Sequence, residues 1–253
     1  MIGSEHTETY LTDMGRSTSP PSNEDIGLVQ MVLTHHLGHV LASVVRGPAV
    51  DIGCGRGEAL GALANLGFSP VEGCDRGIEQ VRAAMAAGFA VEHTDGLSFV
   101  KARCGLAWVS AFDVLEHVAE SDLPELLAAI CRSLSDDGVF VARFPNPSSP
   151  FFGAIQFGDP SHRNIVGPGA LAVLLRRAGF ATWKFMPVRP TPHGIKSTIR
   201  SVVWRLVEAL LYVARVAETG SVGGPLTQNC LVVARKLQAT ALHRAPIEVS
   251  RSG

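Results

Sequence analysis

The sequence lacks several features that would assign it to a particular class of protein. Its 22 lysines and arginines are balanced by 23 aspartates and glutamates, so no excess of positive charge is present to neutralise nucleic-acid phosphates. No apolar run reaches the roughly 18 residues of a membrane span, and the first residues lack the apolar segment of a signal peptide. We therefore expect a soluble, cytoplasmic protein with no nucleic-acid partner.

Cysteine is also scarce, with five residues scattered along the 253 positions and no CxxC pair. Separated thiols in odd number indicate neither a disulfide framework nor a zinc site, and they fit a reducing compartment. His35, His36 and His39 lie close together on an expected helix, but no HExxH motif or nearby acid completes a set of ligands. No metal site is expected.

Short β-rich runs alternate with helical patterns, which predicts a mostly parallel sheet with helices on both faces. Residues 1–23 are expected to form a disordered arm and residues 237–253 a flexible tail around one domain of residues 24–236. Asn23 is expected to cap a first helix over residues 24–45, and a helix at about residues 195–220 is inserted late in the domain. Strands are expected at residues 49–52, 70–74, 90–94, 107–112, 139–144, 181–188 and 230–235.

The stretch AVDIGCGRGEAL, residues 49–60, runs from an expected strand into alternating glycines. The dinucleotide fingerprint GxGxxG does not fit, because Glu58 or Leu60 stands at its third glycine position. An acid near the turn suits a ligand with a cationic amino group better than a pyrophosphate. The turn therefore favours S-adenosylmethionine over a dinucleotide. Its pattern consists of Asp51, Gly53, Gly55 and Gly57.

Acids at two further strand ends extend this candidate site. Asp75 closes the second strand, where a carboxylate can accept both hydroxyls of a ribose. Asp95, followed by Gly96, closes the third strand, where a side-chain acceptor can meet an adenine amino group. Ligands of open α/β sheets lie at the carboxyl ends of the strands, so these groups are expected to share one ligand. Structural roles stay open, because Asp75 can cap the next helix and Asp95 can be a turn residue.

The motifs, in this order, resemble those of the class I S-adenosylmethionine-dependent methyltransferases of the small-molecule type, including enzymes of ubiquinone and sugar pathways. The matching pieces are VDIGCGRG, VEGCD, TDG, FDVLEHV and SLSDDGVFVARFPN. The resemblance implies an α/β, Rossmann-like seven-stranded methyltransferase sheet, mostly parallel, with an antiparallel last strand. It also implies S-adenosylmethionine as cofactor and S-adenosylhomocysteine as its product. The implied cofactor-binding residues are Asp51, Gly53, Cys54, Gly55, Gly57, Asp75, Arg76, Asp95, Gly96, Asp113, Val114 and Leu115.

A long polar loop, residues 145–164, follows the fifth expected strand at the edge where the cofactor is expected. Its GDPSHRN stretch resembles the corresponding part of methyltransferases linked to saccharide or lipid-linked glycan synthesis. His162 is the first candidate for a general base on an acceptor hydroxyl, and His117 is the second. Asp159, Arg163 and His117 are candidates for substrate binding. In the alternative, Asp159 pairs with Arg163 and only closes the loop.

We therefore expect an enzyme that moves a methyl group from S-adenosylmethionine to a small-molecule acceptor, foremost a hydroxyl of a saccharide, lipid-linked glycan or secondary metabolite. The alternatives are N- or C-methylation, a non-catalytic cofactor-binding subunit and an NAD-dependent dehydrogenase. The inserted helix, residues 196–217, gathers arginines and Glu208 in one wedge and is apolar elsewhere. It is a candidate lid on its own domain, a homodimer contact or a peripheral membrane element.

Overall fold

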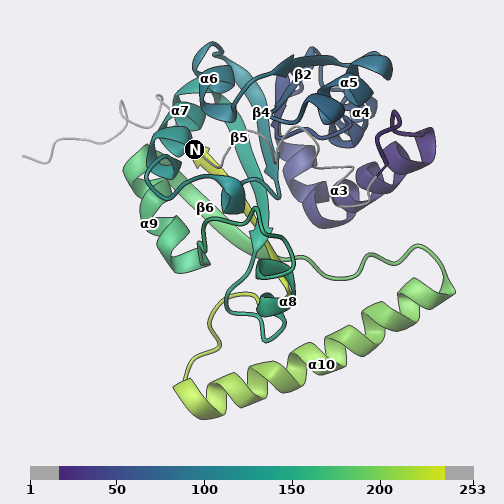
Figure 1. Ribbon diagram of the computed structural model, residues 1–253. Coiled ribbons are helices and arrows are strands. Elements are labelled where there is room, and N and C mark those ends of the chain that lie inside the picture. Colours follow the sequence, from purple (N-terminus) through teal and green to yellow (C-terminus); the bar gives the residue numbers. More distant parts are fainter. Residues whose placement is uncertain (1–16, 237–253) are drawn as a thin grey trace, which may run out of the picture.

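The computed structural model describes residues 17–236, which form one seven-stranded sheet in the order β3-β2-β1-β4-β5-β7-β6 (Figure 1). Neighbouring strands from β3 to β5 are parallel, and β7 runs antiparallel to both β5 and β6. The expected mostly parallel sheet with an antiparallel last strand is confirmed. The strands are β1 (Ala49–Ile52), β2 (Val71–Asp75), β3 (Ala90–His93), β4 (Leu106–Phe112), β5 (Leu134–Pro145), β6 (Phe180–Pro187) and β7 (Asn229–Lys236).

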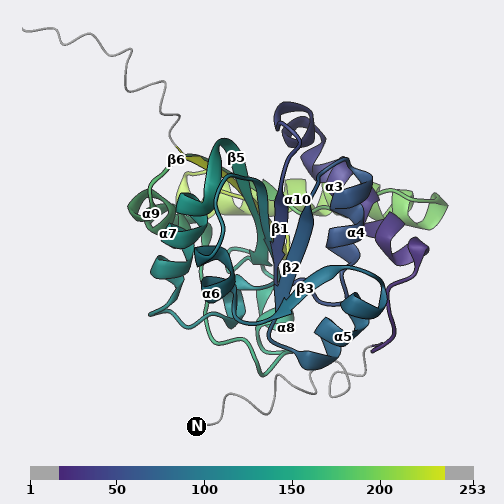
Figure 2. The same ribbon diagram turned by 90° about the horizontal axis from the view of Figure 1, so that it is seen from above.

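Helices cover both faces of the sheet, because its central strands are apolar on both sides. One layer holds α3, α4 and α5, and the opposite layer holds α6, α7 and α9 (Figures 1 and 2). The core side chains of β4 and β5 are shared between the two layers. The helices are α3 (Asn23–Ser43), α4 (Glu58–Asn65), α5 (Ile78–Ala86), α6 (Gly96–Lys101), α7 (Leu123–Ser133) and α9 (Pro168–Ala178).

The first helix begins one residue earlier than its sequence pattern indicated. Ser22, not Asn23, is the N-cap: its hydroxyl accepts from the backbone of Asp25, whose carboxylate accepts in return from the backbone of Ser22. This reciprocal capping box satisfies two N–H groups that the first turn would otherwise leave unpaired. Asn23 is therefore a helical residue, although it was expected to end the arm over residues 1–23. Residues 1–16 of that arm and the expected tail at residues 237–253 lie outside the described residues.

The long inserted helix, α10 (Ile195–Thr219), lies beyond the edge of the sheet where α8 (Phe152–Gln156) follows β5 (Figure 1). A lid would turn its apolar side toward the protein, whereas α10 turns that side outward. Glu208 is only 4% exposed and pairs with Arg189, which follows β6, whereas Leu206 and Leu210 on the other side are 66% and 70% exposed. This ion pair explains why the Glu208 side of α10 turns inward, whereas Arg200 and Arg205 of the same wedge are exposed. None of the helices in residues 17–236 is long and apolar enough to span a bilayer.

Candidate functional site

The glycine turn between β1 and α4 borders open space at the carboxyl edge of the sheet. Gly53 and Gly55 have φ values of +67° and +57°, a region that other residues rarely adopt. A Cβ on Gly53 would lie 2.5 Å from Cγ2 of Val114, so the turn packs closely on the segment after β4. A Cβ on Gly55 would meet no described protein atom within 4 Å. The backbone at Gly55 is therefore accessible to a ligand.

The carboxylate of Asp75 ties this turn to the start of α5. The backbone N–H of Gly55 donates to its Oδ2 at 2.9 Å, and the N–H of Gly77 donates to its Oδ1 at 2.8 Å. Burial raises the pKa of Asp75, and the two backbone donors oppose that rise. Each carboxylate oxygen has a second lone pair, so acceptors remain for ligand hydroxyls. Asp75 does not cap α5, because the N-cap is Gly77 and no side chain caps this helix; its carboxylate instead holds the glycine turn against Gly77 and is still able to accept from a ribose.

We predict that Asp75→Ala weakens the binding of S-adenosylhomocysteine by about ten- to a hundredfold, the range for losing charge-assisted hydrogen bonds. Isothermal calorimetry measures this affinity. Denaturant unfolding of the same variant without ligand measures the structural role of Asp75 separately, because loss of its two backbone hydrogen bonds lowers the free energy of unfolding. An unchanged calorimetric affinity would remove Asp75 from the cofactor site.

Asp51 lies in β1 below the glycine turn and is 2% exposed. The Ser110 hydroxyl donates to its Oδ1 at 2.5 Å. Burial raises the pKa of Asp51 to about 7; the Ser110 hydrogen bond and the charge of Arg143 act against burial, and the charge of Asp75 adds to it. A carboxylate held at such a cost in free energy gains from a nearby cation. The amino group of S-adenosylmethionine fits that requirement.

The third strand end has a local structural role as well as an expected binding role. The carboxylate of Asp95 caps α6 by accepting from the backbone N–H of Ser98 at 2.9 Å and from its hydroxyl at 2.7 Å. A Cβ on Gly96 would lie 2.3 Å from Cγ2 of Ile52, so a glycine lets α6 approach β1. Arg76 is exposed at the same edge. These contacts give Asp95 and Gly96 of the TDG motif a structural role. They leave room for a second role in ligand binding.

Asp113 follows β4 and has a φ of +56°, the one positive value among non-glycine residues of the described chain. Its carboxylate makes a two-point ion pair with Arg143 of β5, with Nε 2.8 Å from Oδ1 and Nη2 against Oδ2. This pair holds an otherwise unfavourable backbone conformation in place. Leu115 is 1% exposed and belongs to the core, so only its backbone is available to a cofactor. Cys54 is buried likewise.

The polar loop after β5 folds back onto the short helix η1 (Leu115–His117). The backbone N–H groups of Arg163 and Asn164 donate to the carbonyl oxygen of Glu116, at 2.8 and 3.0 Å. These bonds bring the rings of His117 and His162 to a centroid distance of 4.8 Å. The two histidines chosen from the sequence therefore lie together. The side chain of Arg163 is exposed.

The loop also fixes the tautomer of His117. Its Nδ1 lies 3.3 Å from the carbonyl oxygen of Ser161 and 3.1 Å from the Ser161 hydroxyl oxygen, and that hydroxyl donates to Asp159 at 2.5 Å. A carbonyl oxygen only accepts, so Nδ1 of His117 carries the hydrogen and Nε2 has a free lone pair. Burial is the largest influence on the pKa of His117 and lowers it. His117 is therefore a neutral base near pH 7.

Glu116, His117 and His162 form the one group among residues 17–236 that has the composition of a metal site. One ligand atom from each lies within 4.8 Å of the other two. Glu116 is 5% exposed, and burial, followed by the charge of Asp113, raises its pKa to about 8. No sequence motif groups these three residues, because the loop brings His162 to η1 from 45 residues away along the chain.

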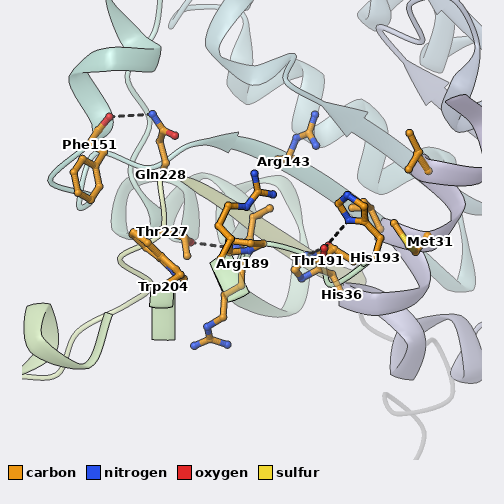
Figure 3. Close-up of a pocket in the computed structure, with 15 residues that line it drawn as sticks. Met31, His36, Arg143, Phe151, Arg189, Thr191, His193, Trp204, Thr227 and Gln228 are labelled. Atoms are coloured by element: carbon orange, nitrogen blue, oxygen red, sulfur yellow. Dashed lines mark hydrogen bonds between the residues drawn. The ribbon is translucent and has the colours of Figure 1, made fainter. Parts of the chain in front are cut away.

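A cavity of about 400 Å³ lies between α3, the carboxyl end of β5 and α10 (Figure 3). The sequence-based substrate candidates Asp159, Arg163 and His117 do not line it. Its lining has three arginines and two histidines but no carboxylate, together with aromatic and aliphatic side chains. The cationic and aromatic lining residues are His36, Arg143, Phe151, Arg189, His193, Arg200 and Trp204.

Most of this cavity could not be recognised in the sequence, because its lining residues come from segments that are far apart along the chain. Arg143 and Arg189 each lie near the end of a strand, and that position is the one signal that could have identified them. Asp113 pairs with Arg143, and Glu208 pairs with Arg189, whereas no described residue pairs with Arg200. The cavity therefore has an excess of positive charge. It meets the cofactor edge at Arg143.

Solved structures with this fold include three methyltransferases. A SAM-dependent methyltransferase from Archaeoglobus fulgidus has a TM-score of 0.63 and 21% identity, with 90% of the present chain and 98% of the other covered. One from Mesorhizobium loti has a TM-score of 0.54 and 19% identity, with 81% and 98% covered. A phosphoethanolamine N-methyltransferase 2 from Haemonchus contortus has a TM-score of 0.56 and 14% identity, with 91% and 56% covered.

Among curated proteins, no match to this sequence was found. A family model described as a methyltransferase domain matches residues 33–184, which is more than half of the chain. The matched residues contain the glycine turn, the acids at the strand ends and the loop that carries His162. The protein belongs to the methyltransferase-domain family and is a class I S-adenosylmethionine-dependent methyltransferase.

Proposed function

We propose that the protein methylates a hydroxyl group of a small-molecule acceptor, in a saccharide, a lipid-linked glycan or a secondary metabolite. The observation that carries this proposal is the orientation of His117, whose Nε2 lone pair is free because Nδ1 is held by Ser161. A hydroxyl is a weak nucleophile at neutral pH and benefits from a base that removes its proton. When bound, S-adenosylmethionine supplies the electrophilic methyl group.

Four elements of the carboxyl edge would hold the cofactor. Asp75 would accept the ribose hydroxyls, and the open backbone at Gly55 would border the methionine portion. Asp51 would balance the charge of the amino group. The Asp95–Gly96 pair would flank the adenine. These roles follow from the family resemblance, and the open space at Gly55 and the raised pKa of Asp51 support them.

The geometry favours His117 over His162 as the base, which reverses the order suggested by the sequence. Nδ1 of His162 is buried and has no hydrogen-bond partner among the described residues, so nothing fixes its tautomer. His117 has both a fixed tautomer and a lowered pKa. His162, in edge contact with that ring, is placed to orient it.

We predict that His117→Gln lowers kcat by about a hundred- to ten-thousandfold, the usual contribution of general base catalysis. Because burial lowers the pKa of His117, the wild-type rate should fall only at a pH below the ordinary histidine range, where this side chain takes up a proton, and this limb should be absent in the variant. Affinity for S-adenosylhomocysteine should stay unchanged in calorimetry. His35→Gln, on the exposed side of α3, is the matched control.

Two outcomes would contradict the assignment. A loss of stability with an unaltered pH profile would make His117 a structural residue. Strong inhibition of the wild-type enzyme by a chelator, reversed by a divalent metal, would instead make Glu116, His117 and His162 ligands. A smaller effect of His162→Gln on kcat, with the same pH limb as the wild type, is expected.

The acceptor class is tested with methyl-labelled S-adenosylmethionine and matched sets of alcohols, amines and activated carbon acids. We expect label in the alcohols and a rate that depends on His117. Transfer confined to amines or carbon acids would overturn O-methylation and leave the methyltransferase assignment intact. Cofactor binding without any transfer would favour a non-catalytic subunit.

A further inference from the structure

The exposed side of α10 is a continuous apolar face along most of the helix. Its members recur at the spacing of one helical side, and each is at least 41% exposed. A soluble helix normally turns such a stripe toward its own core. The residues of this α10 face are Ile195, Ile199, Val202, Val203, Leu206, Leu210, Val213 and Val216.

The opposite side of α10 is held against the protein by an ion pair. Ser197, Ser201 and Glu208 are its buried residues. Glu208 accepts from Arg189 at 2.7 Å, whereas the Ser197 hydroxyl donates at 2.9 Å to the carbonyl oxygen of Gly194, the N-cap of α10 itself. Rotating the helix to bury its apolar face would expose these residues and break the ion pair. The apolar face is therefore directed outward by the fold.

Charge indicates what covers this face. Lys196 and Arg205 are exposed on the N-terminal half of α10 and do not line the cavity, and Glu218 is the one exposed acid of the helix. A second copy packed through the same face would bring net positive charges together. A lipid surface with anionic headgroups would instead attract the basic residues while its acyl region accepts the apolar ones.

The basic cavity lies directly behind this face. Arg200 and Trp204 belong to α10 and line the cavity, and the Trp204 ring lies 6.0 Å from the ring of Phe151. Arg143 and Arg189 enter the same cavity from β5 and from the segment after β6 (Figure 3). A molecule with an anionic group and an apolar chain can thus occupy both surfaces at once.

We propose that the α10 face docks on an anionic lipid surface and that the cavity behind it receives the anionic group of a lipid-borne methyl acceptor. The assignment of the cavity to a methyl acceptor rests on the proposed function, whereas the docking depends only on α10. The proposal restricts the acceptor to amphiphiles that carry a phosphate ester or a carboxylate.

Vesicle sedimentation with the purified full-length protein tests the docking. We expect binding to phosphatidylcholine vesicles that contain phosphatidylglycerol, weaker binding to phosphatidylcholine alone, and weakening by salt. Changing Val203, Leu206 and Leu210 to glutamine should lower the bound fraction at least about tenfold. The matched control changes Val45, Met85 and Val173 to glutamine, three exposed apolar residues elsewhere in the fold.

Each outcome of that experiment decides the docking. Equal losses in the two triple variants, or no binding of the wild type, would overturn it. A wild-type dimer in light scattering that the α10 variant converts to a monomer would also overturn it and assign the face to a second copy. Calorimetry with S-adenosylhomocysteine runs in parallel. If the protein binds S-adenosylhomocysteine but not vesicles, the docking is rejected and the methyltransferase proposal is unaffected.

The cavity is tested with soluble probes, namely inorganic phosphate, a short monoalkyl phosphate and the alkyl glucoside with the same chain. The alkyl phosphate should bind most tightly, and Arg200→Gln should weaken it about tenfold. Arg205→Gln removes the same charge from α10 but not from the cavity lining, so it should leave that affinity unchanged. Equal binding of alkyl phosphate and alkyl glucoside, or equal effects of the two variants, would reject an anionic acceptor.

Discussion

Asp51→Asn is expected to make the ligand-free protein more stable above neutral pH while it abolishes most of the affinity for the cofactor. Burial holds the pKa of Asp51 at about 7, against 3.8 for an ordinary aspartate. Ionisation of this carboxylate in the folded protein therefore costs free energy. The asparagine variant avoids that cost but lacks the negative charge that the cofactor amino group needs.

The direction of the pH effect follows from proton binding. Between about pH 4 and pH 7 the folded protein retains a proton on Asp51 that the unfolded chain has lost, so stability falls as the pH rises. A difference of about three pKa units corresponds to about 4 kcal/mol. The asparagine variant should exceed the wild type by up to that amount near pH 8 and by little near pH 4. Glu116, with its pKa raised to about 8, should cause a residual fall in both proteins.

Urea unfolding across this pH range, with calorimetry of S-adenosylhomocysteine binding, measures both effects of the Asp51 change. Glu120→Gln removes a charge from an exposed position and should alter neither measurement. Should Asp51→Asn bind the cofactor as tightly as the wild type, the carboxylate would be a buried structural group only. Should its stability follow the wild-type pH curve, Asp51 would be ionised in the folded protein throughout.

Gly55→Asn is expected to eliminate cofactor binding and to leave the fold intact. Asparagine tolerates a positive φ better than most residues, and its Cβ would meet no described atom within 4 Å. The protein can therefore accept the side chain, whereas the cofactor would lose the space that it occupies. Calorimetry should show at least about a hundredfold loss of affinity, as for other steric blocks of a preformed pocket.

Gly88 offers a matched control for this substitution. It has a φ of +87° and equally open surroundings, and it lies between α5 and β3, away from the glycine turn. Gly88→Asn should lower the melting temperature about as much as Gly55→Asn and should leave cofactor binding unchanged. Similar affinities in both variants would show that the open space at Gly55 is not the cofactor site.

The sheet and the cofactor edge could be predicted from the sequence because their signals are local. The glycine turn after residues 49–52 identifies a strand and its carboxyl end, and Asp75 marks the carboxyl end of the next strand. The expected strand at residues 49–52 matches β1, and the others lie within a few residues of the observed strands. These elements are fixed by short-range patterns of apolar residues and turns.

The acceptor side could not be predicted in the same way. The lining of the cavity comes from α3, β5 and the loop after it, the segment after β6, α10 and the residues before β7, and no motif links Arg143 to Arg200. The orientation of α10 was equally hidden, because an amphipathic pattern identifies two sides without saying which one is buried. In the structure, Glu208 lies on the buried side and pairs with Arg189, which is 19 positions away along the chain and which no local pattern links to it.

Arg143 belongs both to the cofactor edge and to the lining of the basic cavity. The same guanidinium clamps Asp113, beside the residue on which the glycine turn rests, and contributes to the wall of the basic cavity. If a ligand in either site shifts this side chain, the affinity of each site depends on the occupancy of the other, and thermodynamic linkage makes the two effects equal. A methyl donor and an acceptor that both contact Arg143 or its partner Asp113 would then change each other's binding affinity without any movement of the sheet.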